Sequence, residues 1–304
     1  MNATQRMLEL LNSTFPDLAA MTPDEARAAA DARIRPAPNL DDVARTEDHT
    51  LATAHGPLRV REYHPHAPEQ GSPVTVYAHG GGFLHGSIES HDGFCRRWAS
   101  QTGMRVVSVD YRLAPEHRPA DAADDVAVAA RWAATTTPHG NVVIAGDSAG
   151  ATAALGAALR LRSDAGVHTT ALVAAYPMLD PTCSSESHRT RATGFFVTHR
   201  QLRYYWSVAL ADRIPAPEDT PWLGDDLEGL PATIVVSAGL DVLTDETRAF
   251  AARLRGAGVP TTLRHFPDQF HGFLTMAGYP PGEAAREVLF SDLRALVPTL
   301  TDSE

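Results

Sequence analysis

The chain contains no lysine, and all 26 of its basic residues are arginine. Without lysine, a protein has no ε-amino group for a Schiff base, no P-loop lysine and no Ser-Lys dyad. Enzymes that anchor pyridoxal phosphate on lysine and P-loop nucleotide hydrolases are therefore excluded. The formal net charge is −11, so neither a nucleic-acid groove nor a patch for anionic membranes is expected.

Cysteine and long apolar runs are also scarce. Cys95 and Cys183 lie far apart and lack Cys-x-x-Cys spacing, so we expect two free thiols in a reducing compartment. No apolar run approaches the length of a membrane span, and the first residues lack the basic start and apolar core of a secretory signal. We therefore expect a soluble, cytoplasmic protein without stable membrane insertion.

Most of the 304 residues alternate between short apolar runs and amphipathic helical segments. Apolar strands separated by helices are typical of a mainly parallel α/β sheet with helices on both faces. Two strands are expected around the turn at 55–57, and the others at 74–78, 105–109, 141–145, 171–176, 232–238 and 261–266. The predicted helices lie near 88–101, 120–135, 149–162, 241–256 and 282–297. Together these segments predict an eight-stranded sheet flanked by helices.

Two segments fall outside this alternation. Residues 1–45 contain helical patterns, including a start signal at Thr22 and Pro23. Residues 181–225 are rich in arginine and aromatics, with one predicted helix near 199–210. We interpret both segments as parts of a helical cap. The catalytic core would then comprise 46–180 and 226–304.

The sequence Gly146-Asp147-Ser148-Ala149-Gly150 joins a predicted buried strand to a predicted helix. A serine at such a turn is forced into a strained backbone conformation that projects its hydroxyl away from the sheet, and its neighbours must be small. The alternative is an ordinary loop that favours Gly, Asp and Ser. Because the pattern is short, this motif alone does not decide between the two.

A second motif, His79-Gly80-Gly81-Gly82, directly follows another predicted strand. Consecutive glycines can turn several N–H groups toward one point, as an oxyanion hole requires. The N–H groups of Gly81 and Gly82 are the expected donors, joined by that of Ala149 beside the serine. We expect His79 to support this loop by hydrogen bonding rather than to transfer protons.

A nucleophilic serine needs a base and a group that orients the base. Asp241 and His271 follow the last two predicted strands, so both should lie at the sheet edge that holds Ser148. Four other residues are weaker candidates for these roles. Asp245 and Glu246 suit the first turn of a helix, His265 falls within a strand, and the side chain of Asp147 should point away from the serine hydroxyl.

The 14 histidines raise the question of a metal site. His79, His85 and His91 recur every six residues, which fits neither one face of a helix nor an HExxH pair. His64 and His66 flank a proline in a predicted loop. No segment places histidines and carboxylates at ligand spacing, so neither a metal nor another cofactor is expected.

Taken together, HGGG, DYRLAPEHRPA (110–120), GDSAG, LDVLTDE and HGF resemble, in order and spacing, the hormone-sensitive-lipase-like family. These are the family IV bacterial carboxylesterases of the α/β-hydrolase superfamily. The resemblance extends from about residue 45 to the end and implies an α/β-hydrolase fold with a cap. It implies a catalytic Ser148, Asp241 and His271 with Gly81, Gly82 and Ala149 as the oxyanion hole. Tyr111, Arg112 and Glu116 would brace the site.

Two positions depart from the family pattern. Val242 stands where proline usually follows the catalytic acid, and Ala151 stands where a second glycine usually follows GDSAG. Both replacements are compatible with the local structure, so the three catalytic residues should be retained. They indicate a divergent member, and its substrate cannot be transferred from the family.

The activity expected from the residues and the resemblance is hydrolysis of short- to medium-chain acyl esters through an acyl-enzyme, without a cofactor. Aromatic residues of the 181–225 segment would either line the substrate pocket or anchor the cap: Phe195, Phe196, Tyr204, Tyr205 and Trp206. The alternatives are a deacetylase or amidase acting on a specific small molecule, and a non-catalytic small-molecule receptor such as the gibberellin receptors. A homodimer through the last strand, 261–266, is plausible by analogy.

Overall fold

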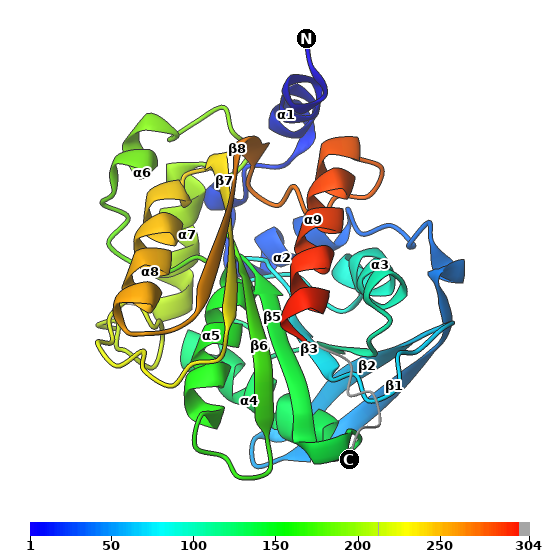
Figure 1. The fold of residues 1–304 in the computed structure, drawn as a ribbon. Helices are drawn as coiled ribbons and strands as arrows, with labels where there is room; N and C mark the ends of the chain where they lie inside the picture. The colour runs from blue at the N-terminus through cyan, green and yellow to red at the C-terminus, as the bar shows by residue number, and fades with distance from the viewer. Residues whose placement is uncertain (212, 298–304) are drawn as a thin grey trace.

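The computed structural model describes residues 1–211 and 213–297, which form one eight-stranded sheet flanked by helices (Figure 1). The strand order is β1-β2-β4-β3-β5-β6-β7-β8. Strands β1 and β2 pair antiparallel, as do β2 and β4, and every other pair is parallel. The strands are β1 (Val43–Thr53), β2 (Gly56–Pro65), β3 (Val74–Ala78), β4 (Val106–Val109), β5 (Asn141–Asp147), β6 (His168–Ala175), β7 (Thr233–Leu240) and β8 (Thr261–Phe270). The predicted, mainly parallel eight-stranded sheet is confirmed.

Helices cover both faces of the sheet and enclose two hydrophobic cores. One core joins the sheet to α4, α5 and α8, and the other joins it to α3 and α9. No helix among residues 1–211 and 213–297 has the length and apolarity of a membrane span. The helices are α1 (Ala3–Thr14), α2 (Pro23–Asp31), α3 (Asp92–Thr102), α4 (Pro119–Ala134), α5 (Ala149–Leu161), α6 (Glu186–Thr190), α7 (His199–Leu210), α8 (Thr244–Gly256) and α9 (Pro280–Leu296).

Helix α5 lies close to the sheet and to α4 because its sequence is made almost entirely of small and apolar residues. Eleven of its residues are buried. A side chain at Gly156 would place its Cβ 2.9 Å from the Cβ of Ala123 on α4. This close packing fixes the start of α5, and with it the turn that carries Ser148.

Several predicted boundaries differ from the structure. Strand β2 reaches Pro65, so His64 lies in a strand rather than in the predicted loop, and α3 begins at Asp92 rather than near 88.

Two further differences lie near the carboxyl ends of the last strands. Helix α8 begins at Thr244 rather than at 241, because Asp241 and the next two residues form a turn in which the Asp241 carboxylate accepts the N–H of Leu243 at 3.0 Å. Strand β8 runs to Phe270 rather than 266, because the register between β7 and β8 shifts after Ala238 and lets Leu240 pair with Phe270. Both differences arise from tertiary pairing that local periodicity does not record.

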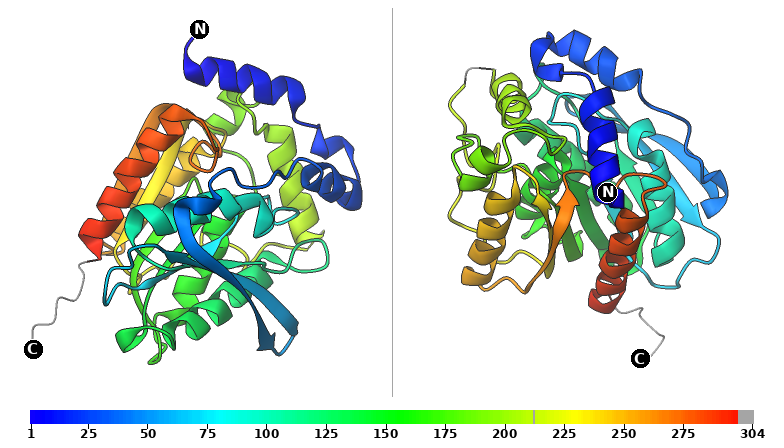
Figure 2. Two further views of the ribbon diagram at one scale, coloured as in Figure 1. Left: turned by 90° about the vertical axis from the view of Figure 1, so that its right-hand side faces the viewer. Right: turned by 90° about the horizontal axis from the view of Figure 1, so that it is seen from above.

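The N-terminal helices contact the segment around α7, far away in the sequence. The side-chain amide of Asn12 donates to the carbonyl of Gly194 at 2.8 Å, and the hydroxyl of Tyr204 donates to the carbonyl of Met21 at 2.9 Å. Figure 2 shows these blue helices next to α7, at the end of the molecule where β7 and β8 finish. Both segments therefore border the sheet edge at which a ligand would bind.

We expect Phe290→Ala in α9 to lower the free energy of unfolding by about 3–5 kcal/mol, because truncating a buried phenylalanine loses apolar burial and leaves a cavity. The Phe290 ring is fully buried, with its centroid 5.0 Å from that of Trp98. Urea unfolding followed by circular dichroism measures the loss. Val288→Ala on the same helix is the control, because Val288 is 40% exposed and its truncation should shift the midpoint little. Equal shifts for the two variants would contradict this account of the core.

Candidate active site

Ser148 occupies a tight turn between β5 and α5. Its backbone has φ 54° and ψ −123°, a conformation that costs energy for any residue with a side chain. A Cβ at Gly150 would lie 2.2 Å from the carbonyl oxygen of Ala78, and one at Gly146 would lie 2.4 Å from the carbonyl oxygen of Gly150. Both positions therefore require glycine, because a Cβ at either one would collide with backbone atoms. The GDSAG segment is thus not an ordinary loop.

The turn brings Ser148 together with the two residues predicted to accompany it. The Nε2 atom of His271, just after β8, lies 2.9 Å from the Ser148 hydroxyl oxygen. The Nδ1 atom of the same ring lies 2.8 Å from a carboxylate oxygen of Asp241, just after β7. All three residues are less than 9% exposed. They form one continuous hydrogen-bonded chain from carboxylate through imidazole to hydroxyl.

The electrostatic environment favours a positive charge on His271. Burial opposes protonation of the ring, but the adjacent Asp241 carboxylate outweighs it and raises the pKa of His271 above its ordinary value. In a site with little water, such a pair interacts more strongly than it would at the surface. The imidazole is thus suited to accept a proton from Ser148 and hold it.

The glycine loop after β3 curves over the same site. Gly81 and Gly82 have φ values of 135° and 62°, which L-residues rarely adopt. The carbonyl of Gly81 accepts the N–H groups of Leu84 at 3.1 Å and His85 at 3.0 Å, closing a turn. Within the described residues, the N–H groups of Gly81 and Gly82 donate to no protein acceptor. These donors line the pocket beside Ser148.

Asp147, a weaker candidate for the acid that orients the base, instead holds this loop in place. One of its carboxylate oxygens accepts the N–H of Gly80 at 2.8 Å and the hydroxyl of Tyr77 at 2.6 Å, and lies 3.3 Å from Nε2 of His91. Burial opposes ionisation of Asp147, but His91 and Tyr77 outweigh it and lower the pKa of the carboxyl. Asp147 therefore links the serine turn to the glycine loop. Its place next to the nucleophile was the only sequence signal for this role.

His79 supports the loop, as expected from the sequence. Its ring is fully buried, bonds through Nδ1 to the carbonyl of Gly80 at 2.9 Å, and stacks on Tyr111 with centroids 4.3 Å apart. The Tyr111 hydroxyl donates to the His79 carbonyl at 2.6 Å. Burial lowers the pKa of His79 to about 3, so the ring stays neutral at physiological pH.

Arg112 and Glu116 brace the segment after Tyr111 in different ways. Arg112 binds the carboxylate of Asp125 on α4, with Nε 2.9 Å from Oδ2. Glu116 accepts from Arg27 of α2 at 2.8 Å, and Arg27 also donates to the carbonyl of Leu84 at 3.0 Å. Arg27, which the sequence did not single out, thus ties an N-terminal helix to the glycine loop.

Asp245 and Glu246, the other acids considered for the role of Asp241, lie in the helix that follows it and form hydrogen bonds to neighbouring segments. Both Asp245 and Glu246 fall in the first turn of α8, as expected. The backbone N–H of Ser187 donates to Asp245 at 2.7 Å, and buried Glu246 accepts the N–H of Leu179 at 2.7 Å. Glu246 also lies 2.9 Å from Nε2 of His188. Sequence reasoning missed His188, because its partner is 58 residues away.

His265, the other histidine considered as the base, lies within β8, and its Nδ1 atom is 3.2 Å from the Ser237 hydroxyl.

A pocket of about 200 Å³ opens onto Ser148 and His271. Of the five aromatic residues considered for this role, Phe196 and Tyr205 line it. Of the other three, Trp206 is buried against Phe83 in the loop after β3 and so serves as an anchor. Phe195 packs under Arg191, and the Tyr204 hydroxyl donates to the carbonyl of Met21, so both contacts stay within residues 1–45 and 181–225. The N-terminal segment supplies further lining residues that the sequence did not indicate: Phe15, Ala30, Asp31 and Ile34.

Comparison with known proteins places the chain in a family. Residues 75–275 match the model of a family described by its alpha/beta hydrolase fold. The chain is 33% identical over 254 residues to the carboxylic ester hydrolase LipN of Mycobacterium tuberculosis, covering 79% of this chain and 67% of that one. It is 32% identical over 267 residues to the gibberellin receptor GID1B of Arabidopsis thaliana, covering 83% of this chain and 73% of the receptor.

Among solved structures, the chain is similar to the ester hydrolase EH1AB1 from the metagenome of Lake Arreo. The two are 30% identical, with a TM-score of 0.87 over 97% of this chain and 98% of that one. The chain therefore belongs to the hormone-sensitive-lipase-like esterases of the α/β-hydrolase superfamily. The family, the fold and the enzyme class predicted from the sequence, a carboxylic ester hydrolase, are confirmed.

We expect Gly82→Ala to reduce kcat for an ester substrate by about 10²–10³, the size of the effect of removing one oxyanion-hole donor, because the added Cβ should displace the N–H of Gly82 from its place in the pocket. An added Cβ would lie 2.4 Å from the Tyr205 ring, so the loop or the ring must move. Steady-state hydrolysis of p-nitrophenyl butyrate measures the loss.

Gly278→Ala is the matched control, because Gly278 also has a positive φ of 66° but has no atom within 4 Å of its added Cβ. This control carries the backbone strain of about 1–2 kcal/mol without the collision, and kcat should stay unchanged. A similar loss of kcat in both variants would show that backbone strain, rather than the collision with Tyr205, causes the effect.

Proposed function

We propose that this protein hydrolyses short- to medium-chain acyl esters through an acyl-enzyme on Ser148, with His271 as the base and Asp241 as its partner. The observation that carries the proposal is the hydrogen-bonded chain of 2.9 Å and 2.8 Å that joins the three residues. A serine, an imidazole and a carboxylate in this arrangement have the geometry of an activated nucleophile.

In the proposed reaction, His271 takes the proton of Ser148 as its oxygen attacks the ester carbonyl. Asp241 keeps the proton on Nδ1 of the ring, so that Nε2 faces the serine, and stabilises the imidazolium that forms. His271 then protonates the departing alcohol. Water attacks the acyl-enzyme in the same way, and the carboxylic acid leaves with Ser148 restored. No step in this sequence requires a cofactor.

We assign the oxyanion to the N–H groups of Gly81, Gly82 and Ala149. The first two stand in the glycine loop held by Asp147, and the third begins α5, where the helix dipole also favours negative charge. Donors already fixed before the reaction stabilise the developing charge without reorganising. The positive φ values of Gly81 and Gly82 and the buried Asp147 that holds their loop support this assignment.

The size and lining of the pocket support a small acyl group. A volume of about 200 Å³ is below the roughly 300–1,000 Å³ of pockets for drug-sized ligands. We propose that residues 1–45 and 181–225 form the cap over this pocket, since Phe15 and Phe196 line it and pack edge-to-face at 5.1 Å. Location in the cytoplasm, and a homodimer through the edge strand β8, remain predictions.

A receptor on the same fold is the alternative from another functional class, because one relative is a gibberellin receptor. A receptor needs the pocket but has no use for an aligned serine, imidazole and carboxylate. The alignment of Ser148 with His271 and Asp241 therefore favours the esterase.

We expect Ser148→Ala to lower kcat on p-nitrophenyl acetate, butyrate, octanoate and laurate by about 10⁶, to the level of background hydrolysis. The wild-type enzyme should show an optimum at a short or medium chain. Ser90→Ala is the control, because Ser90 also lines the pocket but bonds through its hydroxyl to Ser87 and His91. Turnover that survives in Ser148→Ala would rule out this nucleophile. Comparing an anilide with the matching phenyl ester separates an esterase from an amidase.

We expect kcat/KM to rise with pH through an apparent pKa above 6.5, because His271 must be neutral to act as a base and Asp241 raises its pKa. Asp241→Asn removes that carboxylate while burial continues to disfavour the charged ring. Its profile should move to lower pH, with kcat reduced about 10⁴-fold.

The measurement is kcat/KM for p-nitrophenyl butyrate from about pH 5 to pH 9. His265→Gln serves as the control histidine, since His265 lies within β8 rather than at the serine. An unchanged inflection in Asp241→Asn would show that another group governs the profile.

A further inference from the structure

Outside the pocket, the hairpin of β1 and β2 gathers histidines and glutamates on one face. In the antiparallel register Glu47 pairs with Glu62, and Arg45 pairs with His64. Residues two apart on a strand share a face, so His49 joins them. Two glutamates directly opposite each other repel and destabilise a strand pair unless something compensates. The two carboxylates therefore need compensating partners nearby.

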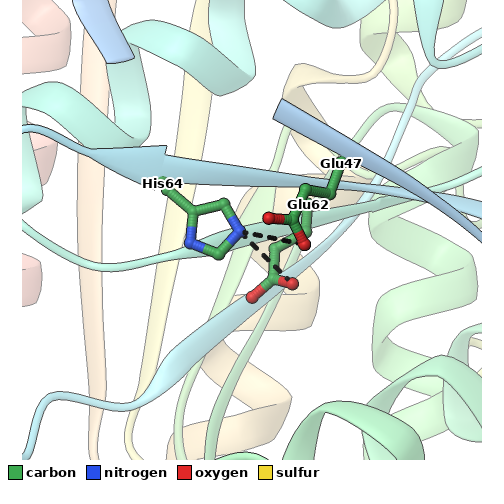
Figure 3. A group of neighbouring side chains, drawn as sticks. All are labelled: Glu47, Glu62 and His64. Carbon is green, nitrogen blue, oxygen red and sulfur yellow. Dashed lines mark ion pairs between the residues drawn. The ribbon is translucent and has the colours of Figure 1, made fainter. Parts of the chain in front are cut away.

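The side chains converge rather than splay apart, as Figure 3 shows for Glu47, Glu62 and His64. The Nε2 atom of His64 lies 3.5 Å from Oε2 of Glu62 and 3.9 Å from Oε2 of Glu47. The Nε2 atom of His49 lies 3.5 Å and 3.8 Å from the same two oxygens. Two imidazole nitrogens and two carboxylate oxygens thus face one another at distances longer than hydrogen bonds.

The other oxygen of each carboxylate is already in use. Oε1 of Glu47 accepts from Arg45 at 2.6 Å, and Oε1 of Glu62 accepts from Arg105 at 2.6 Å. Each Oε2 is left for the imidazoles. The two arginines balance the two carboxylates, so net charge alone would not attract a cation. Any attraction must come from the directed nitrogen and oxygen lone pairs.

The imidazole nitrogens lack the partners that burial requires. Nε2 of His49 and Nε2 of His64 are both buried and have no hydrogen-bond partner among the described residues. The side chains of Glu62 and His64 are only 7% and 12% exposed. A buried polar atom without a partner costs free energy. A cation bound between them would supply that partner to His64 and would contact both carboxylates.

We propose that Glu47, Glu62 and His64 form a binding site for a divalent transition-metal ion of the Zn²⁺ class. His49 faces the same carboxylate oxygens but stands outside this group. Tetrahedral ligands about 2.0–2.1 Å from zinc lie roughly 3.3 Å apart, so the distances of 3.5 Å and 3.9 Å from His64 need to contract by about 0.2 Å and 0.6 Å. Nitrogen donors favour zinc-like ions over Ca²⁺ and Mg²⁺, which prefer oxygen. The ion would cross-link β1 and β2, independently of the proposed esterase reaction.

A second group of potential ligands, Asp180, His188 and Glu246, is a weaker candidate. Nε2 of His188 and Oε2 of Glu246 already lie 2.9 Å apart as an ion-pair contact, so these two groups can partner each other without an ion. The hairpin site departs from the expectation of no metal. Spacing along the chain could not reveal it, because its ligands come together across two strands.

The test is titration of metal-free full-length protein with Zn²⁺ by calorimetry, and with Co²⁺ by the visible absorption of tetrahedral cobalt. We expect one tight equivalent of Zn²⁺ and a rise in Tm of about 5 °C when Zn²⁺ is present at a hundredfold excess over Kd. Glu62→Gln, which retains an acceptor for Arg105, and His64→Asn should each weaken binding at least about tenfold. In both variants the Zn²⁺-dependent rise in Tm should fall to about half or less of the wild-type rise.

His66→Asn is the matched control, because His66 lies just beyond β2 and contacts the carbonyl of Asp41. It should bind Zn²⁺ like the wild type. Tm is compared with and without Zn²⁺ for each variant, so any effect of a substitution on stability alone cancels. Absence of the tight equivalent in the wild type, or its full retention in both Glu62→Gln and His64→Asn, would overturn the proposal. Esterase kinetics are not used in this test, so the two proposals can fail separately.

Discussion

The close approach of the loop after β3 to the first turn of α5 is the constraint on which the site depends. At the position of Gly150, the Cβ of any other residue would collide with the carbonyl oxygens of Ala78 and His79. This contact brings the serine turn and the glycine loop into one compact unit. Because backbone rather than flexible side chains meets here, neither part can shift without the other. The positions of the nucleophile and of the expected oxyanion donors are therefore set together.

Buried polar groups hold the serine turn, the glycine loop and His271 in position through hydrogen bonds. Asp147 joins the loop to the serine turn, and Asp241 orients His271. Glu246 holds the backbone at Leu179 and faces His188 behind the Asp241 turn. Hydrogen bonds of this kind are strong in a medium of low dielectric, and each is costly to leave unpaired. The same low dielectric that makes His271 responsive to Asp241 thus also makes the surrounding network rigid.

Much of this could be predicted from the sequence. The strands that carry the site, the serine turn, the glycine loop and the order of Ser148, Asp241 and His271 all depend on local patterns of apolar residues and glycine. Other features could not be predicted, because they depend on segments far apart in the chain. Arg27 reaches the glycine loop from α2, Phe15 enters the pocket from beyond α1, and β8 extends because it pairs with β7.

The sequence by itself determined the sheet, the family and the residues that carry the expected chemistry, since these depend on local patterns and on the order of short motifs along the chain. Only the tertiary structure decided which aromatics line the pocket, what Asp147 holds, and that Glu47, Glu62 and His64 meet across a hairpin. The physical reason is the same in each case. A side chain's direction and its partners depend on register and packing between elements, and neither is written in the spacing of residues along one element.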